Sequence, residues 1–272
     1  MDIQSGHQVV KFGGLDFALN LDWRHERQYF DFIEHQKLSG SLAMDVWVYK
    51  HFVTSGDLVL DAGANIGFTS LVGLRSGAKA VHLFEPDPRF CKRLEALAAQ
   101  DSRLVFHAAA LGEKEAELKL QVSTSHNQGS TLNSKHLELF PSVYENSKEV
   151  VVRVESIDGM FGDLTFDFFK VDVEGAEFAA LKGALNKLRT EPPKNIYVEL
   201  YDEYHAPVHE LLSQFYPYVY RVVCSHTGVG RLFDISTDFE ALRAENYFVG
   251  PPSYIYSIND QKSLAESWTP MA

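Results

Sequence analysis

The feature that most constrains the fold is a regular alternation of apolar strand segments and helical segments that starts at residue 57. The runs "DLVLDAG", "AVHLFEP" and "FDFFKVDV" are almost continuously apolar, and each is followed by a segment with helical periodicity. Strands that are apolar on both faces occur in parallel sheets that helices cover on both sides. We therefore predict an α/β fold with a doubly wound, mostly parallel sheet.

The segments outside this alternation predict an N-terminal extension and an inserted hairpin. Residues 1–56 contain one short predicted strand, 15–19, and two predicted helices, 26–37 and 41–53. The runs "AELKLQV" and "EVVVRV" are expected to form a β-hairpin around a long polar excursion, residues 122–148. Late strands are predicted in "YVYRVVC" and "SYIYSI". We predict one domain, in which residues 1–56 extend a unit that spans residues 57–272.

The composition narrows the classes of partner. The 272 residues carry a formal net charge of −12. This charge disfavours nucleic acid and anionic lipid, because both need a basic protein face. Cys91 and Cys224 have no metal or redox spacing, so we expect free thiols in a reducing compartment. No segment has the apolar length of a signal or membrane helix, and we predict a cytoplasmic protein without membrane contact.

The first strand of the alternation ends in a glycine-containing turn, "VLDAGANIGFTS". Gly63 permits a tight turn after Asp61, and Gly67 permits close packing at the start of the next helix. A nicotinamide fingerprint would need glycines where Asn65 and Phe68 stand, so a Rossmann-type oxidoreductase is disfavoured. Such a turn also occurs as an ordinary strand-to-helix connection, so it needs support from a second motif.

The next strand supplies that support, because "HLFEPDP" places Glu85 at its end, 24 residues after Asp61. A carboxylate at this position can accept hydrogen bonds from both hydroxyls of a ribose. The prolines Pro86 and Pro88 restrict the path of the chain after it. The alternative is a solvent-exposed glutamate before a helix. With no phosphate-binding motif beside it, the pair of motifs favours a nucleoside without pyrophosphate, and S-adenosylmethionine fits.

Taken in order, "VLDAGANIGFTS", "LFEPDP", "HAAALG", "FFKVDVEGAEFAALKGA" and "IYVELY" resemble the FkbM-type methyltransferases. The likeness covers residues 57 to about 202. It implies a class I methyltransferase, Rossmann-like sheet of seven strands and S-adenosyl-L-methionine as donor. It also implies O-methylation of a hydroxyl on a small molecule such as a sugar, a glycan or a polyketide-like metabolite. Residues 1–56 and 203–272 match less distinctly, and acceptor choice is expected to lie there.

The resemblance also implies roles for individual residues. Glu85 would take the ribose hydroxyls, and Asp87 and Ala109 would border the adenine. The methionine and ribose would be lined by Gly63, Ala64, Asn65 and Gly67. A Gly-Ser pair in the hairpin loop matches Gly129 and Ser130. The complete predicted cofactor-binding set is Asp61, Gly63, Ala64, Asn65, Gly67, Glu85, Pro86, Asp87, Ala109, Ser130 and Asp172.

Three carboxylates, Asp172, Glu174 and Glu177, cluster where the strand "FDFFKVDV" ends. Asp172 is expected beside the sulfonium, where a carboxylate favours the cation. The acceptor hydroxyl must lose a proton, and Asp172 or Glu174 could act as the base, since clustered acids raise one another's pKa. Glu174 can equally be an ordinary acid before a helix. For Glu177 we favour a first-turn acid that complements the helix dipole.

Other polar residues offer alternatives for the base and for a metal. His126, His205 and His226 each follow a strand and could act as base, although each could be an ordinary surface histidine. The predicted catalytic set is Asp172, Glu174 and His205. A Mg²⁺ site could use Asp172 and Glu199 with Asp202 or His205, but a metal is not favoured. Lys170 is interpreted as a structural ion-pair partner, and Tyr201 to Tyr204 as packing or a sugar-stacking surface.

Several functions therefore remain open beside O-methyl transfer. An N-methyltransferase acting on a small amine would use the same cofactor site, and a non-catalytic scaffold would be expected to lose Glu85 or the glycines. We expect a small-molecule hydroxyl acceptor, no nucleic acid, and a chain that could form a homodimer. The excursion 122–148 is predicted to close over the cofactor as a lid, because it is long, polar and close to the site.

Overall fold

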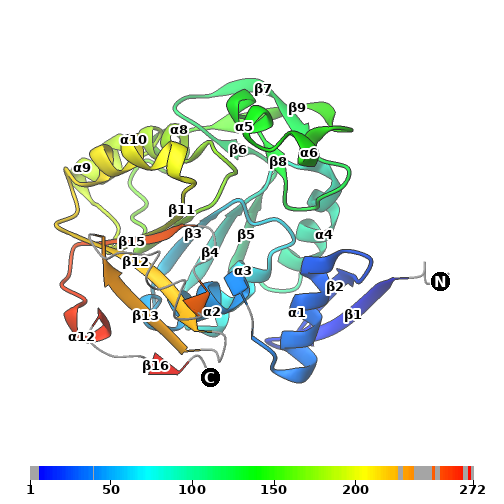
Figure 1. Cartoon of the computed structure of the whole chain (residues 1–272), viewed down its shortest axis with the longest axis horizontal. Coiled ribbons are helices and arrows are strands. Elements are labelled where there is room, and N and C mark those ends of the chain that lie inside the picture. Colours follow the sequence, from blue (N-terminus) through cyan, green and yellow to red (C-terminus); the bar gives the residue numbers. More distant parts are fainter. Residues whose placement is uncertain are drawn as a thin grey trace.

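The computed structural model describes residues 6–38, 40–225, 229–235, 247–248, 252–265 and 269–270. Within these residues, ten strands form one central sheet with the order β16-β13-β12-β15-β11-β10-β3-β4-β5, and β14 pairs with β12 (Figure 1). The strands are β3 (Leu58–Ala62), β4 (Ala80–Phe84), β5 (Leu104–His107), β10 (Phe168–Val171), β11 (Asn195–Glu199), β12 (Tyr218–Ser225), β13 (Val229–Asp234), β14 (Tyr247–Phe248), β15 (Ser253–Ser257) and β16 (Thr269–Pro270).

The seven strands from β5 to β12 have the order and directions that the resemblance described above implies. Strands β5, β4, β3, β10 and β11 are parallel, and β15 is inserted antiparallel between β11 and β12. The predicted α/β class and the mostly parallel sheet are confirmed. The sheet is wider than the predicted seven strands, because β13, β14 and β16 continue it with antiparallel pairs beyond or beside β12.

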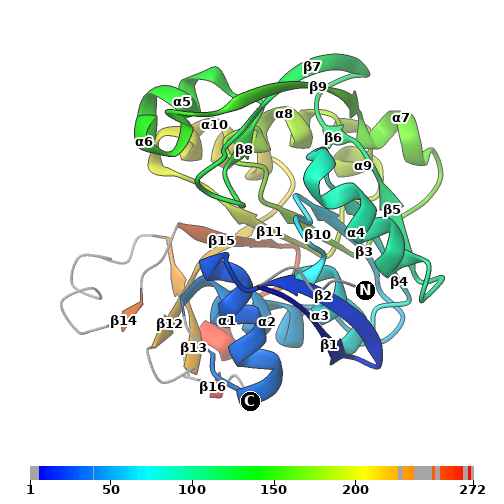
Figure 2. The same cartoon turned by 90° about the vertical axis from the view of Figure 1, so that its right-hand side faces the viewer.

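Helices cover both faces of this sheet, as the doubly wound prediction requires (Figure 2). Strand residues alternate between two cores, so that Val59 packs into one and Leu60 into the other. The first core includes residues of α2 (Gly40–Phe52), α3 (Phe68–Arg75) and α4 (Pro88–Ala98), and the second includes residues of α7 (Ile157–Phe161), α8 (Glu177–Lys182), α9 (Leu185–Thr190) and α10 (Asp202–Leu212). A short helix, α12 (Lys262–Ala265), lies near the end of the chain.

The N-terminal extension packs against the sheet-covering helices. A hairpin of β1 (His7–Phe12) and β2 (Leu15–Asn20) precedes α1 (Arg24–His35), so the predicted short strand has a partner that the pattern missed. Phe68 of α3 stacks on Tyr29 of α1 with ring centroids 4.4 Å apart, and on Phe12 of β1 at 5.5 Å. These contacts bring α1 and α2 to the carboxyl end of the sheet, where the functional site is expected.

The predicted hairpin is present and forms part of a second, smaller sheet. Strand β7 (Ala116–Val122) pairs antiparallel with β9 (Lys148–Glu155). Strands β6 (Ala110–Leu111) and β8 (Ser130–Thr131) complete the order β6-β9-β7-β8. The excursion between β7 and β9 also contains two short helices that the sequence pattern did not predict, α5 (Ser134–Leu139) and α6 (Pro141–Tyr144). In the described part of the chain, no helix is both long and apolar enough to cross a membrane.

Candidate active site

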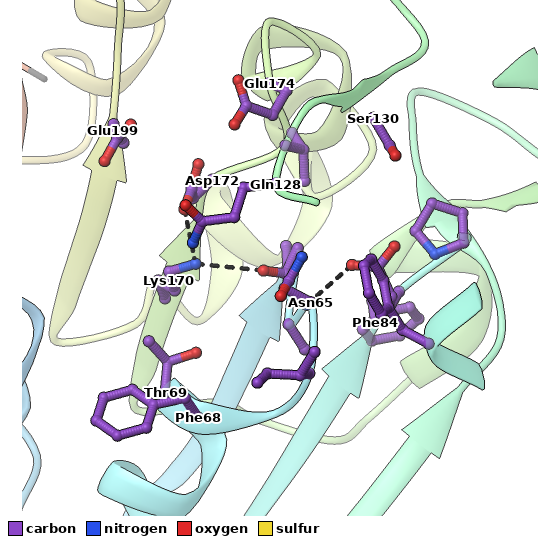
Figure 3. Close-up of a pocket in the computed structure, with 18 of the residues that line it drawn as sticks. Asn65, Phe68, Thr69, Phe84, Gln128, Ser130, Lys170, Asp172, Glu174 and Glu199 are labelled. Atoms are coloured by element: carbon purple, nitrogen blue, oxygen red, sulfur yellow. Dashed lines mark hydrogen bonds and ion pairs between the residues drawn. The ribbon is translucent and has the colours of Figure 1, made fainter. Parts of the chain in front are cut away.

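A cavity of about 310 Å³ lies at the carboxyl ends of β3, β4, β10 and β11 (Figure 3). Residues of α1 and α2 and the segment 126–132 complete its wall. Parallel strands place their carboxyl ends at one edge of the sheet, so residues that are distant in sequence meet there. Of the predicted cofactor-binding set, those that line the cavity are Gly63, Ala64, Asn65, Glu85, Pro86, Ala109, Ser130 and Asp172.

The glycine turn after β3 is shaped by close backbone contact. Gly63 has φ +79°, and a Cβ atom placed on it would collide with the backbone oxygen of Asp172. Glycine is therefore required for the β3 turn and the loop after β10 to meet at the cavity. Asn65 also has a positive φ, +52°. Its side-chain Oδ1 is buried and accepts no hydrogen bond within the described residues, so it can accept one from a ligand.

Asp61 and Gly67 lie behind the cavity wall and support the turn. Asp61 is fully buried, and its Oδ2 accepts hydrogen bonds from Thr69 Oγ1 at 2.7 Å and Ser70 Oγ at 2.6 Å. These bonds fasten the first turn of α3 to the end of β3. Gly67, with φ +89°, begins α3, and a Cβ there would lie 2.8 Å from Leu97 Cδ2 of α4. We infer that both residues position the site rather than contact a ligand.

Glu85 is held in a fixed orientation at the end of β4. Its Oε2 accepts the backbone N–H of Asn65 at 2.9 Å, and its Oε1 accepts the backbone N–H of Asp87 at 2.8 Å. The side chain is 6% exposed, and burial raises the pKa of its carboxyl to about 8. Each oxygen retains a lone pair that can accept a further hydrogen bond, so a ribose with two adjacent hydroxyls matches this carboxylate.

Asp87 does not line the cavity, and its carboxylate forms hydrogen bonds and an ion pair with other residues of the protein. It caps α4 by accepting the backbone N–H of Arg89 and pairs with the Arg89 guanidinium at 2.6 Å. Ser130 Oγ, which lies at the cavity, donates to Asp87 Oδ2 at 2.6 Å. Asp87 therefore links α4 to the segment around β8, and its predicted contact with adenine stays a prediction.

Lys170 and Asp172 form a buried ion pair at the end of β10. Lys170 Nζ lies 3.0 Å from Asp172 Oδ2 and 3.8 Å from Asp61 Oδ1. Burial alone would lower the pKa of Lys170, but the negative charges of Asp172, Asp61 and Asp45 raise it above its usual value. The lysine therefore stays charged. It is the structural partner predicted from the sequence, and it also lines the cavity (Figure 3).

The other two clustered carboxylates have different surroundings. Glu174 lines the cavity with φ +53°, and its Oε2 lies 3.2 Å from His136 Nε2 of α5. Burial raises the pKa of Glu174 above its usual value. Glu177 lies outside the cavity, and its Oε1 accepts the backbone N–H groups of Val173 and Gly175 at 3.1 and 3.0 Å. Its role is to shape the loop that carries Asp172, which is more specific than the expected interaction with a helix dipole.

The N-terminal extension adds a polar wall that sequence reasoning missed. From α1 and α2, the residues His25, Gln28, Tyr29, Ser41, Leu42 and Asp45 line the cavity. Asp45 accepts a hydrogen bond from the hydroxyl of Tyr197 in β11 at 3.0 Å. The signal was available in the sequence, because Asp45 is the single acid in the apolar helical run "SLAMDVWVYKHFV".

The histidine predictions divide into three outcomes. His126 lines the cavity, with its ring 5.0 Å from that of His25, and burial lowers the pKa of both. The structure does not bring His205 to the cavity. Its side chain extends from α10, and its ring centroid lies 4.6 Å from that of Tyr254. His226 lies outside the described residues. His205 is therefore not among the residues that line the cavity, and its catalytic role stays a prediction.

The predicted metal alternative also lacks a complete ligand set. Asp172 and Glu199 both line the cavity, but among the described side chains no three of His, Cys, Asp or Glu are grouped to hold a metal ion. The side chain of Asp202 is outside the described part of the chain. A magnesium ion stays a prediction, and no step below uses one.

The segment that joins β7 to β8 is bonded to the cavity wall on both sides. Asn127 donates its side-chain N–H to Glu26 of α1 at 3.1 Å, and its backbone oxygen accepts from the Asn65 side chain at 2.8 Å. Gln128 donates to the Tyr29 hydroxyl at 3.1 Å. These contacts hold the segment across the cavity, as the lid prediction requires, and movement of the segment remains a prediction.

A family model described as the Methyltransferase FkbM domain matches residues 61–222. No curated protein matches the sequence. Among solved structures, an FkbM methyltransferase from Methylobacillus flagellatus KT is 18% identical, with a TM-score of 0.43, over 87% of this chain and 62% of its own. This chain therefore spans less than two thirds of that protein.

Two further solved structures are similar to parts of this chain. A SAM-dependent methyltransferase from Agrobacterium tumefaciens is 11% identical, with a TM-score of 0.45, over 95% of this chain and 72% of its own. A 16S rRNA methyltransferase from T. Thermophilus, in complex with AdoMet and guanosine, is 12% identical, with a TM-score of 0.45, over 93% of this chain and 50% of its own.

Proposed function

This chain belongs to the FkbM methyltransferase family, and on that premise we propose that it is a SAM-dependent methyltransferase that methylates a hydroxyl of a small molecule. A sugar, a glycan or a polyketide-like metabolite is the proposed acceptor. The observation that carries the proposal is the set of carboxylates on the side of the cavity away from Phe84, where Figure 3 shows Asp172, Glu174 and Glu199.

The chain's own residues fit S-adenosylmethionine, which supplies an electrophilic methyl group when it is bound. Glu85 would accept the ribose hydroxyls, and the turn at Gly63 and Asn65 would lie against the methionine and ribose. The adenine would lie beside Pro86 and Ala109, which line the cavity after Glu85. Asp172 would favour the positive sulfonium through its negative charge, although Lys170 neutralises part of that charge.

The lining of the cavity bears on the class of acceptor. Its carboxylates are Asp45, Glu85, Asp172, Glu174 and Glu199. Those acids that are ionised repel phosphate groups, and the oxygens of both ionised and neutral carboxyl groups accept hydrogen bonds from hydroxyl groups. Together with the net charge of −12, this favours an uncharged, hydroxyl-bearing small molecule over a nucleic acid. An ammonium-bearing acceptor would also be attracted, so methylation of an amine is the second candidate.

A direct test uses S-adenosylmethionine with a labelled methyl group and three classes of acceptor. The classes are methyl glycosides and phenols, amino sugars, and a 16S rRNA fragment. We expect formation of S-adenosylhomocysteine with the hydroxyl acceptors, and nuclear magnetic resonance should locate the label on oxygen. Label on nitrogen would establish the amine alternative, and label in RNA would refute a small-molecule acceptor. NADH serves as the binding control and should not bind, because Asn65 and Phe68 interrupt the nicotinamide fingerprint.

A further inference from the structure

We propose that Asp45, in helix α2 of the N-terminal extension, is the general base that takes the proton from the acceptor hydroxyl, and that Tyr197 positions it. The inference rests on the proposed hydroxyl acceptor. It assigns a catalytic role to a residue outside the segment 61–222 that the family model matches. The extension would then form part of the catalytic centre rather than only a cover over it.

The position of Asp45 is unusual for an acid. Its neighbours on α2, among them Met44, Val46 and Trp47, are buried in the apolar core, whereas Asp45 lines the cavity. Burying an acid in an otherwise apolar helix costs free energy unless its carboxylate is hydrogen-bonded, so such an acid is a candidate for a role in binding or catalysis. The α2 helix is a rigid element, so the carboxylate reaches the cavity from a fixed point.

Tyr197 fixes the orientation of this carboxylate. The tyrosine is 2% exposed in β11, and its hydroxyl donates to Asp45 Oδ1 at 3.0 Å. Within the described residues, Oδ2 of Asp45 accepts no hydrogen bond, so it is available to a proton from a ligand. A base held by a second group and facing a reacting proton is the arrangement that general-base catalysis requires.

The other acids of the cavity are less suited to this step. Asp172 is paired with the charged Lys170, Glu174 is paired with His136, and both oxygens of Glu85 accept backbone N–H groups. Among the described residues, Glu199 has no such partner. Burial and the nearby charges of Asp172 and Glu174 hold the pKa of Glu199 well above its usual range, which favours the protonated carboxyl and makes it a poorer proton acceptor.

The electrostatic surroundings of Asp45 support its role. Burial raises its pKa to about 7, with Asp172 and Asp61 adding to the rise while Lys170 and the Tyr197 hydrogen bond oppose it. A base with a pKa near the working pH combines a deprotonated population with a useful affinity for the proton. Glu199 also acts on it electrostatically. The remaining titratable neighbours are Tyr29, Tyr49 and Cys224, which are neutral in this pH range.

The proposed step balances as a direct displacement. Asp45 Oδ2 accepts the hydroxyl proton while the acceptor oxygen bonds to the methyl carbon and the carbon–sulfur bond breaks with its electron pair left on sulfur. The products are a methyl ether, a neutral thioether and a protonated Asp45, which returns its proton to solvent. No oxidant or metal enters the balance.

The test uses the isosteric variants Asp45→Asn and Tyr197→Phe in the full chain, with Asp16→Asn as a control. Asp16 is an exposed acid of the same extension, paired with Lys11 on the surface. With a hydroxyl acceptor found above, Asp45→Asn should lower kcat about 100- to 10,000-fold while the affinity for S-adenosylhomocysteine stays within threefold. The control should match the unchanged protein. A kcat within threefold of the unchanged protein for Asp45→Asn would overturn the inference.

Tyr197→Phe separates positioning from a purely structural role. Loss of the hydrogen bond to the carboxylate raises the pKa of Asp45, so the acidic limb of the kcat/KM profile should move to higher pH. An unmoved limb with an unchanged kcat would remove Tyr197 from the proposal.

A second readout needs no acceptor. In protein with ¹³Cγ-labelled aspartate, the resonance absent from Asp45→Asn should titrate near pH 7. Titration below pH 5 would overturn the role of Asp45 whatever the acceptor. Titration near pH 7 with no turnover of any hydroxyl acceptor would instead refute the proposed hydroxyl acceptor and leave Asp45 as the base of the cavity.

Discussion

Replacement of Glu85 by glutamine is the perturbation that best tests the cofactor site. The measurement is made at about pH 9, above the pKa of about 8 that burial gives Glu85, so that its carboxylate is charged. Two ribose hydroxyls that donate to this charged carboxylate contribute about 1.5–3 kcal/mol each. Their loss predicts an interaction weaker by about 3–6 kcal/mol, or a Kd higher by roughly 150- to 25,000-fold. Glutamine adds a second penalty, because both Glu85 oxygens accept backbone N–H groups and an amide has only one oxygen.

The chain supplies a matched control for this variant in Glu177→Gln. Glu177 is also a buried glutamate whose pKa burial raises to about 8, but it does not line the cavity. Its two backbone N–H donors share one oxygen, Oε1, which a glutamine can provide. Calorimetric titration with S-adenosylhomocysteine should therefore show a large loss of affinity for Glu85→Gln and a change below threefold for Glu177→Gln.

A 2′-deoxy analogue of S-adenosylhomocysteine isolates the ribose contact from any distortion of the turn. In the unchanged protein, the missing hydroxyl should cost about 1.5–3 kcal/mol of binding free energy. In Glu85→Gln, the loss of binding free energy caused by the missing hydroxyl should be much smaller, because this variant no longer has the charged hydrogen-bond acceptor. An equal cost in both proteins would refute the assignment of Glu85 to the ribose.

Three other predictions follow from the contacts around the cavity. Asn127→Ala removes the hydrogen bond to Glu26, so S-adenosylhomocysteine should dissociate about tenfold faster in stopped-flow measurements. The control Lys119→Ala, which breaks an exposed ion pair with Glu149, should leave the dissociation rate unchanged. Equal dissociation rates in the two variants would exclude a lid. In urea unfolding, Gly63→Ala should lower the free energy of unfolding far more than Gly56→Ala. Both glycines have a positive φ, but only at Gly63 would the added Cβ collide with another part of the chain, the backbone oxygen of Asp172. Similar losses of stability in the two variants would show that the loop carrying Asp172 can move aside. Folding raises the pKa of Glu177 to about 8, so the folded state binds the extra proton, and this residue should lower the free energy of unfolding by up to about 1.4 kcal/mol per pH unit as pH rises from about 5 to 8. Glu85 and Asp45 also have raised pKa values and add to the total slope, so Glu177→Gln should reduce the slope by the share of Glu177 rather than abolish it. A slope that Glu177→Gln leaves unchanged would contradict the raised pKa of Glu177.

Local sequence was enough to locate two features that line the cavity. The turn at Gly63 and the carboxylate at the end of β4 follow from short motifs placed at strand ends, and the topology brings such ends to one edge of a sheet. The function of Glu177 and the absence of His205 from the cavity could not be predicted, because they depend on which way a loop or helix turns after its strand.

The sequence by itself determined the α/β class, the family and the location of the cofactor motifs, because apolar periodicity and turn chemistry act over a few residues. Only the tertiary structure decided which polar groups meet across the cavity. Asp45 and Tyr197 are 152 residues apart, and Glu26 and Asn127 are 101 apart, yet each pair shares a hydrogen bond. Such pairs form because packing of α1 and α2 on the sheet selects them, and no local pattern records the partner of a distant residue.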